Sequence, residues 1–398
     1  MKKIIPLVTL ILSLLIVNTS IAQHNTGKFE KRKAGFYSKE IIPALQKKAT
    51  AKSHKSFVTD ITIANIPTNK ESFKYFWHNT PESQGSTGTC WCYAATSFVE
   101  SEIYRTTNQK VELSEMYFTY CDYIERAKLF VEKRGDVYFN HGSEANAVLL
   151  RMQQYGAVPL SEYAGKPTKA KFHDHGKMMD EMKAFLAKTK ENNNWNSKDV
   201  ISTIKAIMNH YMGTPPQSFT IEGKQYSPMS YMKDYLKFHP DNYQSLMSTM
   251  SAPYHQESEL IEADNWFHGD NYYNVPIKEY MTIIDKAIKK GYTICVCGDV
   301  SEPGNNSFKE VSIIPDFDIP SGYINQSARE LRLQNKATTD DHCLHLVGYK
   351  TIDNVKWYLI KDSGAGGFDG DNKGYRFFHE DYIKLKIMNI MLHKDMTK

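Results

Sequence analysis

The pattern of apolar and polar positions changes partway along the chain. In the first two thirds, apolar residues recur three and four positions apart, which predicts amphipathic helices. Towards the C-terminus, short apolar runs bounded by polar turns such as Asp353-Asn354 predict strands, mostly antiparallel. The predicted helices cover residues 90–106, 114–129, 144–155, 178–186, 200–211 and 277–288. The predicted strands cover residues 292–297, 344–349, 357–361 and 375–378, with a candidate strand at 61–66.

Capping residues indicate where several of these helices begin and end. Ser114 is a suitable N-cap for the second helix, and Gly156 and Gly291 end two others. Thr89 can act as an N-cap for the first helix, which places Cys90 in its first turn. The positive end of a helix favours a thiolate over a thiol. Cys90 is therefore a candidate nucleophile.

Three segments resemble the active-site segments of papain-like cysteine peptidases. They are Gln84–Tyr93, Asp341–Tyr349 and Trp357–Ser363, and they follow the family's order of glutamine, cysteine, histidine and orienting residue. The closest branch is that of bleomycin hydrolase and aminopeptidase C, which Tyr155–Pro159 and Gly298–Val300 also resemble. The resemblance implies an α+β fold of two parts, a helical left half and an antiparallel, β-rich right half, with the cleft between them.

The resemblance implies catalytic roles for four residues. Cys90 would attack the peptide carbonyl, and His342 would act first as base and then as acid. Gln84 and the backbone N–H of Cys90 would stabilise the oxyanion. Asp362 would orient the imidazole, at a position where the family usually has Asn. A carboxylate stabilises imidazolium by charge as well as by hydrogen bonding, so we expect activity to extend to higher pH than in an Asn enzyme.

Two neighbouring residues bear on this assignment. His345 is the competing histidine, but it lies an odd number of steps along the predicted strand and should point away. Gly364 stands where the family has a Trp, so a contact that shelters the His–Asp pair is expected to be lost. The departures at Asp362 and Gly364 leave a catalytically impaired peptide-binding protein as an alternative. An endopeptidase is a further alternative.

The bleomycin hydrolase branch implies a more specific function, an aminopeptidase acting on peptides. In that branch the C-terminal tail occupies part of the cleft and selects free amino termini; here the tail would be Leu392–Lys398. A large helical insertion also fits the branch, and we expect it at about 166–276. The branch often forms hexamers, so a homo-oligomer is an open expectation.

The N-terminal region has the features of an exported protein. Residues 1–22 combine Lys2 and Lys3, an apolar run and a small-residue end, which predicts a signal peptide. A membrane anchor is the alternative, but the apolar run is short for a span. Residues 23–60 form a basic leader, expected to be partly disordered or propeptide-like. Residues 61–398 are the expected peptidase domain, periplasmic or secreted.

Composition excludes several other classes of function. The 398 residues are 41% hydrophobic and 24% charged, which is typical of a globular protein. The net charge of +4, or +2 without Lys2 and Lys3, is too weak to indicate nucleic-acid binding. No phosphate-binding glycine loop is present. We expect peptides as substrates, no nucleic acid, no cofactor and no membrane span after signal removal.

The cysteines and histidines do not form a metal-binding pattern. Cys295 and Cys297 share one face of an apolar strand and are expected to be free thiols in the core. The two Cys-x-Cys pairs do not have the usual zinc spacing, and His173 and His175 stand in a polar loop. Residues 369–372 lack the 12-residue calcium loop. The pairing of Cys92, Cys121 and Cys343 stays open.

Overall fold

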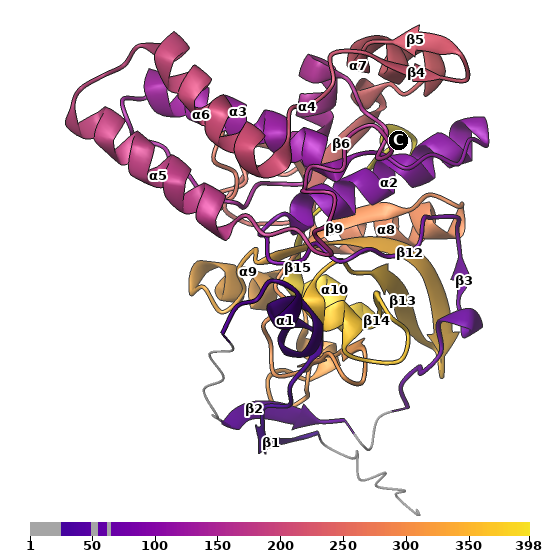
Figure 1. Cartoon of the computed structure of the whole chain (residues 1–398). Helices are drawn as coiled ribbons and strands as arrows, with labels where there is room; N and C mark the ends of the chain where they lie inside the picture. The colour runs from indigo at the N-terminus through magenta and orange to yellow at the C-terminus, as the bar shows by residue number, and fades with distance from the viewer. Residues whose placement is uncertain (1–24, 49–54, 62–64) are drawn as a thin grey trace, which may run out of the picture.

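The computed structural model describes residues 25–48, 55–61 and 65–398, and in it helices and strands gather in two halves (Figure 1). The helices are α1 (Ile42–Ala44), α2 (Cys90–Thr107), α3 (Glu115–Glu132), α4 (Asn146–Tyr155), α5 (Gly176–Glu191), α6 (Ser197–Met212), α7 (Pro228–Ser230), α8 (Ile277–Lys289), α9 (Gln326–Gln334) and α10 (Glu380–Lys386). The strands are β1 (Thr26–Lys31), β2 (Lys55–Asp60), β3 (Lys74–Tyr75), β4 (Phe219–Ile221), β5 (Lys224–Tyr226), β6 (Tyr243–Met247), β7 (Glu257–Ser258), β8 (Tyr272–Asn274), β9 (Ile294–Gly298), β10 (Asn305–Asn306), β11 (Val311–Ser312), β12 (His342–Ile352), β13 (Val355–Lys361), β14 (Tyr375–His379) and β15 (Ile387–His393).

One sheet of eleven strands organises the second half of the chain. Its strands follow the order β10-β11-β14-β13-β12-β9-β15-β6-β8-β7, and β3 also pairs with β12. The pairs β11–β14 and β6–β8 are parallel, and the other pairs are antiparallel. The expected α+β architecture is confirmed.

Helix α2 joins the two halves. Every residue from Trp91 to Ile103 is buried, because α2 packs against α3 and α4 on one side and against β12 and β9 on the other. A single apolar core therefore contains Phe98 of α2 together with Cys295 and Met391 of the sheet. This packing places Cys90, the first residue of α2, at the boundary of the halves.

Local signals predicted most element boundaries well. Ser114 caps α3 by accepting a hydrogen bond from the Tyr117 N–H at 3.1 Å. Asp353 and Asn354 both have positive φ, as a tight hairpin between β12 and β13 requires. The capping prediction for Thr89 is wrong in one respect. Thr89 stands at the N-cap position, but its hydroxyl pairs with another threonine hydroxyl, and its side chain accepts no helix N–H.

The region 166–276 is only partly the helical insertion that the sequence predicted. Helices α5 and α6 pack against each other, and α6 packs against α3. The last part of the region instead forms β6, β8 and β7, which extend the large sheet beyond β15. These strands have two to five residues, too short for apolar periodicity to indicate them.

The expected position of the C-terminal tail is wrong. The tail begins in β15, a central strand between β9 and β6, and the Lys398 carbonyl accepts a hydrogen bond from Lys286 on α8 at 2.8 Å. His393 lies close enough to Glu102 and Arg105 for their charges to act on its imidazole. Those residues are twelve and fifteen positions beyond Cys90, so about 18–22 Å along α2. The tail therefore lies near the later turns of α2 and near α8, and not beside Cys90.

The described part of the leader is folded against the rest of the protein. Strands β1 and β2 pair with each other, and Phe36 stacks on Phe368 with ring centroids 5.0 Å apart. Lys47 pairs with Asp174 at 2.8 Å. The expectation of partial disorder therefore fails for residues 25–48 and 55–60. The predicted signal peptide and residues 62–64 of the candidate strand lie outside the described residues, and Ile61 is not in a strand.

A disulfide joins two central strands of the sheet. Cys297 of β9 and Cys343 of β12 stand directly opposite each other and are bonded. The expectation of a free thiol is thus wrong for Cys297 but holds for Cys295, which is buried and free. The sequence could not indicate this bond because strand register across 46 residues is set by tertiary packing. In the described part of the chain, no helix is long and apolar enough to cross a membrane.

Candidate active site

The proposed catalytic residues come together where α2 meets the sheet. Cys90 is the first residue of α2, His342 the first residue of β12, and Asp362 follows β13 directly. The His342 Nε2 lies 2.8 Å from the Asp362 Oδ1. The Cys90 side chain interacts with the same imidazole and raises its pKa. The interactions therefore run in one line from Cys90 through His342 to Asp362.

The surroundings of the imidazole favour its charged form. Burial opposes the imidazolium, but the charges of Asp362 and Cys90 and the hydrogen bonds to both raise the pKa of His342 well above its usual value. Burial also acts on Asp362, yet His342 and the Gly364 N–H hold the pKa of its carboxyl below the usual value. The carboxylate is only 2% exposed, so its charge acts on His342 with little screening by water.

Two glycines cover the His–Asp pair. The Gly364 N–H donates to the Asp362 Oδ1 at 2.7 Å, and a Cβ on Gly364 would lie 3.0 Å from the His342 ring. A Cβ on Gly367 would lie 2.9 Å from the Asp362 side chain. The shelter that we expected to be lost with the family's Trp is therefore supplied by backbone packed against the pair.

Arg376 is a member of the site that the sequence analysis missed. It lies in the middle of β14, is 3% exposed, and places Nη1 3.8 Å from the Asp362 Oδ2. Its Nη2 donates to Asn305 and Ser312. Its charge helps to keep Asp362 ionised. The available signal was a single arginine inside the apolar run Tyr375–Phe378.

Gln84 is held beside the site by the loop that follows Asp362. Its Oε1 accepts a hydrogen bond from the Ser363 hydroxyl at 2.9 Å, and its backbone N–H donates to the Ser363 carbonyl at 3.0 Å. One N–H of its Nε2 donates to the Thr87 carbonyl at 2.8 Å. The amide has a second N–H, which leaves one donor for a substrate. The Cys90 N–H also has no intrahelical partner, because Cys90 is the first helical residue.

The other histidines stand apart from this line. His345 is fully buried, and its Nδ1 is 2.9 Å from the Ser97 hydroxyl, so it is a packed core residue. His141, His173 and His175 form a cluster with neighbouring ring centroids 6.2 Å apart. Across the described residues no group of three His, Cys, Asp or Glu could hold a metal ion.

Comparisons with known proteins agree with this geometry. The model of the Peptidase C1-like family matches residues 26–137 and 153–398. Cysteine proteinase 15A of Pisum sativum is 28% identical over 177 residues, which are 42% of this chain and 46% of that protein. The crystal structure of PepW from Lactobacillus rhamnosis HN001 has a TM-score of 0.65 at 16% identity, covering 81% of both chains. The family model covers most of the chain, so this protein belongs to the Peptidase C1-like family of papain-like cysteine peptidases.

Proposed function

We propose that the protein is an exported cysteine peptidase that hydrolyses peptide bonds with Cys90 as nucleophile. The observation that carries the proposal is the line from Cys90 through His342 to Asp362, with Gln84 held beside it. A buried carboxylate, a charged imidazole and a thiol that interacts with this imidazole are what nucleophilic catalysis by cysteine requires.

The first half of the reaction forms a thioester. The Cys90 sulfur attacks the carbonyl carbon, a C–S bond forms, and the carbonyl π electrons move to oxygen. Gln84 Nε2 and the Cys90 N–H donate hydrogen bonds to this oxyanion, and each such donor is worth about 3 kcal/mol of barrier. The C–N bond then breaks, and His342 gives its proton to the leaving amine.

The second half restores the enzyme. Neutral His342 takes a proton from water as the water oxygen attacks the thioester carbon. The same donors stabilise the second oxyanion. The C–S bond then breaks with its electron pair on sulfur, which leaves a thiolate beside an imidazolium. Asp362 holds the imidazole in one orientation throughout, because its hydrogen bond fixes the Nε2 side of the ring.

Two features support export. The pattern of residues 1–22 is that of a signal peptide. The Cys297–Cys343 disulfide suits an oxidising compartment, where such bonds persist. We propose a periplasmic or secreted location, with a homo-oligomer as a further expectation.

Aminopeptidase action is the finer part of the proposal. It can no longer rest on the C-terminal tail, since that tail belongs to β15 and contacts α8. A free amino terminus would need another anionic partner near Cys90. Without such a partner the protein would act as an endopeptidase.

The test is hydrolysis of fluorogenic aminoacyl and peptidyl amides, with free and blocked amino termini, beside a Cys90→Ala control. We expect cleavage that the control lacks. Cleavage of unblocked substrates only indicates an aminopeptidase, and cleavage of blocked ones as well indicates an endopeptidase. Absence of cleavage in a folded protein would contradict the proposed hydrolysis and favour a peptide-binding protein.

A further inference from the structure

A buried carboxyl group and a partly exposed one meet close to the proposed catalytic residues. One amide nitrogen, Nδ2 of Asn389 on β15, donates to both, at 3.1 Å to the Glu144 Oε2 and at 2.9 Å to the Asp340 Oδ2. Glu144 stands two residues before the start of α4 and is 1% exposed. Asp340 stands two residues before His342 and is partly exposed. The pair thus has an inner member, Glu144, and an outer member that solvent can reach.

Neither carboxyl has a cationic partner among the described residues. The Glu144 Oε1 is buried and accepts no hydrogen bond. The charges that act on Glu144 come from Asp264 and Glu262, which are both acids. Those two have cations of their own, since Lys336 lies 3.5 Å from Glu262 and Arg126 acts on Asp264. Of the four acids, Glu144 and Asp340 are therefore the two that have no cationic partner among the described residues.

The pair is close enough to Cys90 to take part in substrate binding. The charge of Cys90 helps to raise the pKa of the Asp340 carboxyl and of the Cys295 thiol, and the charge of Glu144 does the same. Because Asp340 also stands two residues before His342, a peptide whose carbonyl reached Cys90 would lie within range of the Asp340 charge. An ionised carboxylate that is buried without a partner is costly, so a cation bound at this place would stabilise the ionised form of the pair.

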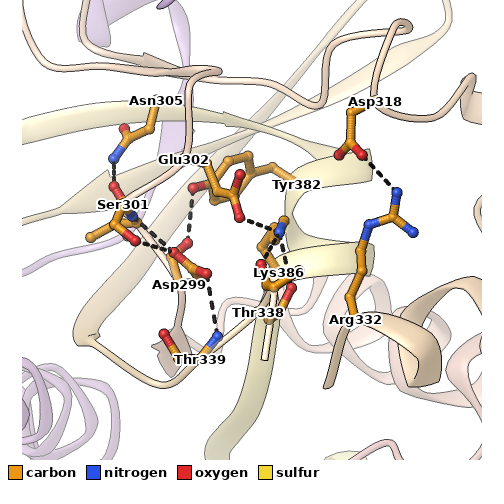
Figure 2. A network of polar contacts seen from close by, with 12 residues as sticks. Asp299, Ser301, Glu302, Asn305, Asp318, Arg332, Thr338, Thr339, Tyr382 and Lys386 are labelled. Atoms are coloured by element: carbon orange, nitrogen blue, oxygen red, sulfur yellow. Dashed lines mark hydrogen bonds and ion pairs between the residues drawn. The ribbon is translucent and has the colours of Figure 1, made fainter. Parts of the chain in front are cut away.

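The loop that carries Asp340 is fixed in place before any substrate arrives. Figure 2 shows the network: the Asp299 carboxylate accepts the Thr339 N–H at 3.3 Å, and Lys386 donates to the Thr338 hydroxyl at 2.9 Å. The Tyr382 hydroxyl donates to the Asp299 carbonyl at 2.8 Å, which ties Asp299, the partner of Thr339, to α10. Asp340 follows this anchored segment, so little ordering is needed on binding.

We propose that Asp340, with Glu144 and Asn389 behind it, forms a subsite for a positively charged group of the substrate. The inference rests on the proposed peptidase function and adds a substrate class. The group is an ammonium or guanidinium, which belongs either to the amino terminus or to a lysine or arginine side chain. A metal ion is not the occupant, because the described residues offer no set of three ligands.

The protonation of the pair fits such an occupant. Burial raises the pKa of Glu144 to about 8, and burial together with Glu144 raises that of Asp340. The empty pair therefore holds at least one proton at neutral pH. A substrate cation would replace that proton, so that a charge-assisted hydrogen bond forms where a neutral acid stood.

The test measures binding to the Cys90→Ala protein by calorimetry, so it does not depend on turnover. The neutral probe is an acetylated tripeptide amide of norleucine. Three further acetylated probes carry lysine in place of one of the three norleucines, and the last probe is the norleucine tripeptide amide with a free amino terminus. We expect one lysine position, or the unblocked peptide, to bind at least about tenfold tighter than the neutral blocked peptide. Tighter binding of one lysine peptide identifies a side-chain cation as the occupant. Tighter binding of the unblocked peptide identifies the amino terminus.

Variants decide whether the pair is responsible. Asp340→Asn and, separately, Glu144→Gln should remove the preference, while Asp174→Asn, whose carboxylate is paired with Lys47, should keep it. Thermal unfolding confirms that each variant is folded. Binding of all probes within twofold of each other, or a preference unchanged in both Asp340→Asn and Glu144→Gln, would overturn the subsite. The hydrolysis of neutral peptides by the unmodified protein would still stand, so the two proposals fail separately.

Discussion

Two clusters of largely desolvated acidic side chains lie in the same part of the molecule as the catalytic residues. They differ in whether a cation of the protein lies nearby. Glu100 and Glu115 lie near Lys361, whose charge lowers the pKa of each, although burial still raises them to about 7 and about 8. Burial also raises the pKa of Glu144 and of Asp340, but these two have no cationic partner in the described structure. A cluster that contains its own counter-charge is explained by folding alone. A cluster without one, beside a nucleophile, is explained by a ligand.

The largest expected effect comes from removing the internal cation. Lys361→Met should lower the free energy of unfolding by about 3 kcal/mol at pH 8, since it leaves buried acids without a partner. The loss should be smaller at pH 6. A carboxyl whose pKa is raised by folding destabilises the folded state once the pH exceeds the pKa that this carboxyl has in the unfolded chain. At pH 6 more of these acids are protonated, and a protonated acid needs no counter-charge. Urea unfolding at both pH values measures it.

The matched control is an exposed lysine in a surface pair. Lys171→Met breaks the contact with Glu40, and such pairs contribute less than about 1 kcal/mol. If Lys361→Met also lowers the free energy of unfolding by less than about 1 kcal/mol, or if its loss does not depend on pH, Lys361 does not neutralise the cluster.

Asp362 is a third buried carboxyl, with cationic partners in both His342 and Arg376. Asp362→Asn should move the basic limb of the activity profile to lower pH, because Asp362 raises the pKa of His342 and the imidazolium is lost once pH exceeds that value. The expected shift is at least one pH unit, about 1.4 kcal/mol. The pH dependence of kcat/KM measures it, and an unchanged basic limb would count against the role of the charge.

The smallest of these effects has the opposite sign. Asp340→Asn should raise the free energy of unfolding by about 1 kcal/mol at pH 8, because it removes a desolvated acid that no cation stabilises. The gain should fade as pH drops towards about 3.9, where the unfolded carboxyl is protonated too. Destabilisation at pH 8 in the ligand-free protein would mean that Asp340 has an internal partner.

The sequence predicted the elements that depend on local signals and the site residues that depend on chain order. Helix α2 and the Asp353-Asn354 hairpin follow from spacing and turn chemistry, and Cys90 and His342 follow from their motifs. What it missed depends on contacts between distant segments. Asn389 contacts Glu144 across 245 positions and belongs to β15, a strand that the sequence pattern did not predict.

The same limit explains the corrections in the site. The Cys297–Cys343 bond depends on the register of β9 against β12, and Arg376 matters only because β14 lies beside β13. The glycine cover over Asp362 could not be predicted, because the absence of a side chain gives no sign of what backbone replaces it. Two signals were visible in the sequence, namely Asp340 immediately before the histidine motif and Arg376 inside an apolar run.

The most direct test of the account is the rate at which iodoacetamide alkylates Cys90 as a function of pH, followed by mass spectrometry. Cys92, Cys121 and Cys295 are buried, so Cys90 is the accessible free thiol of the described chain. If His342, held charged by Asp362, stabilises the thiolate, alkylation at pH 6 should be at least about 100-fold faster than in His342→Ala. Equal rates in the two proteins at pH 6, rising only above pH 8, would contradict the account.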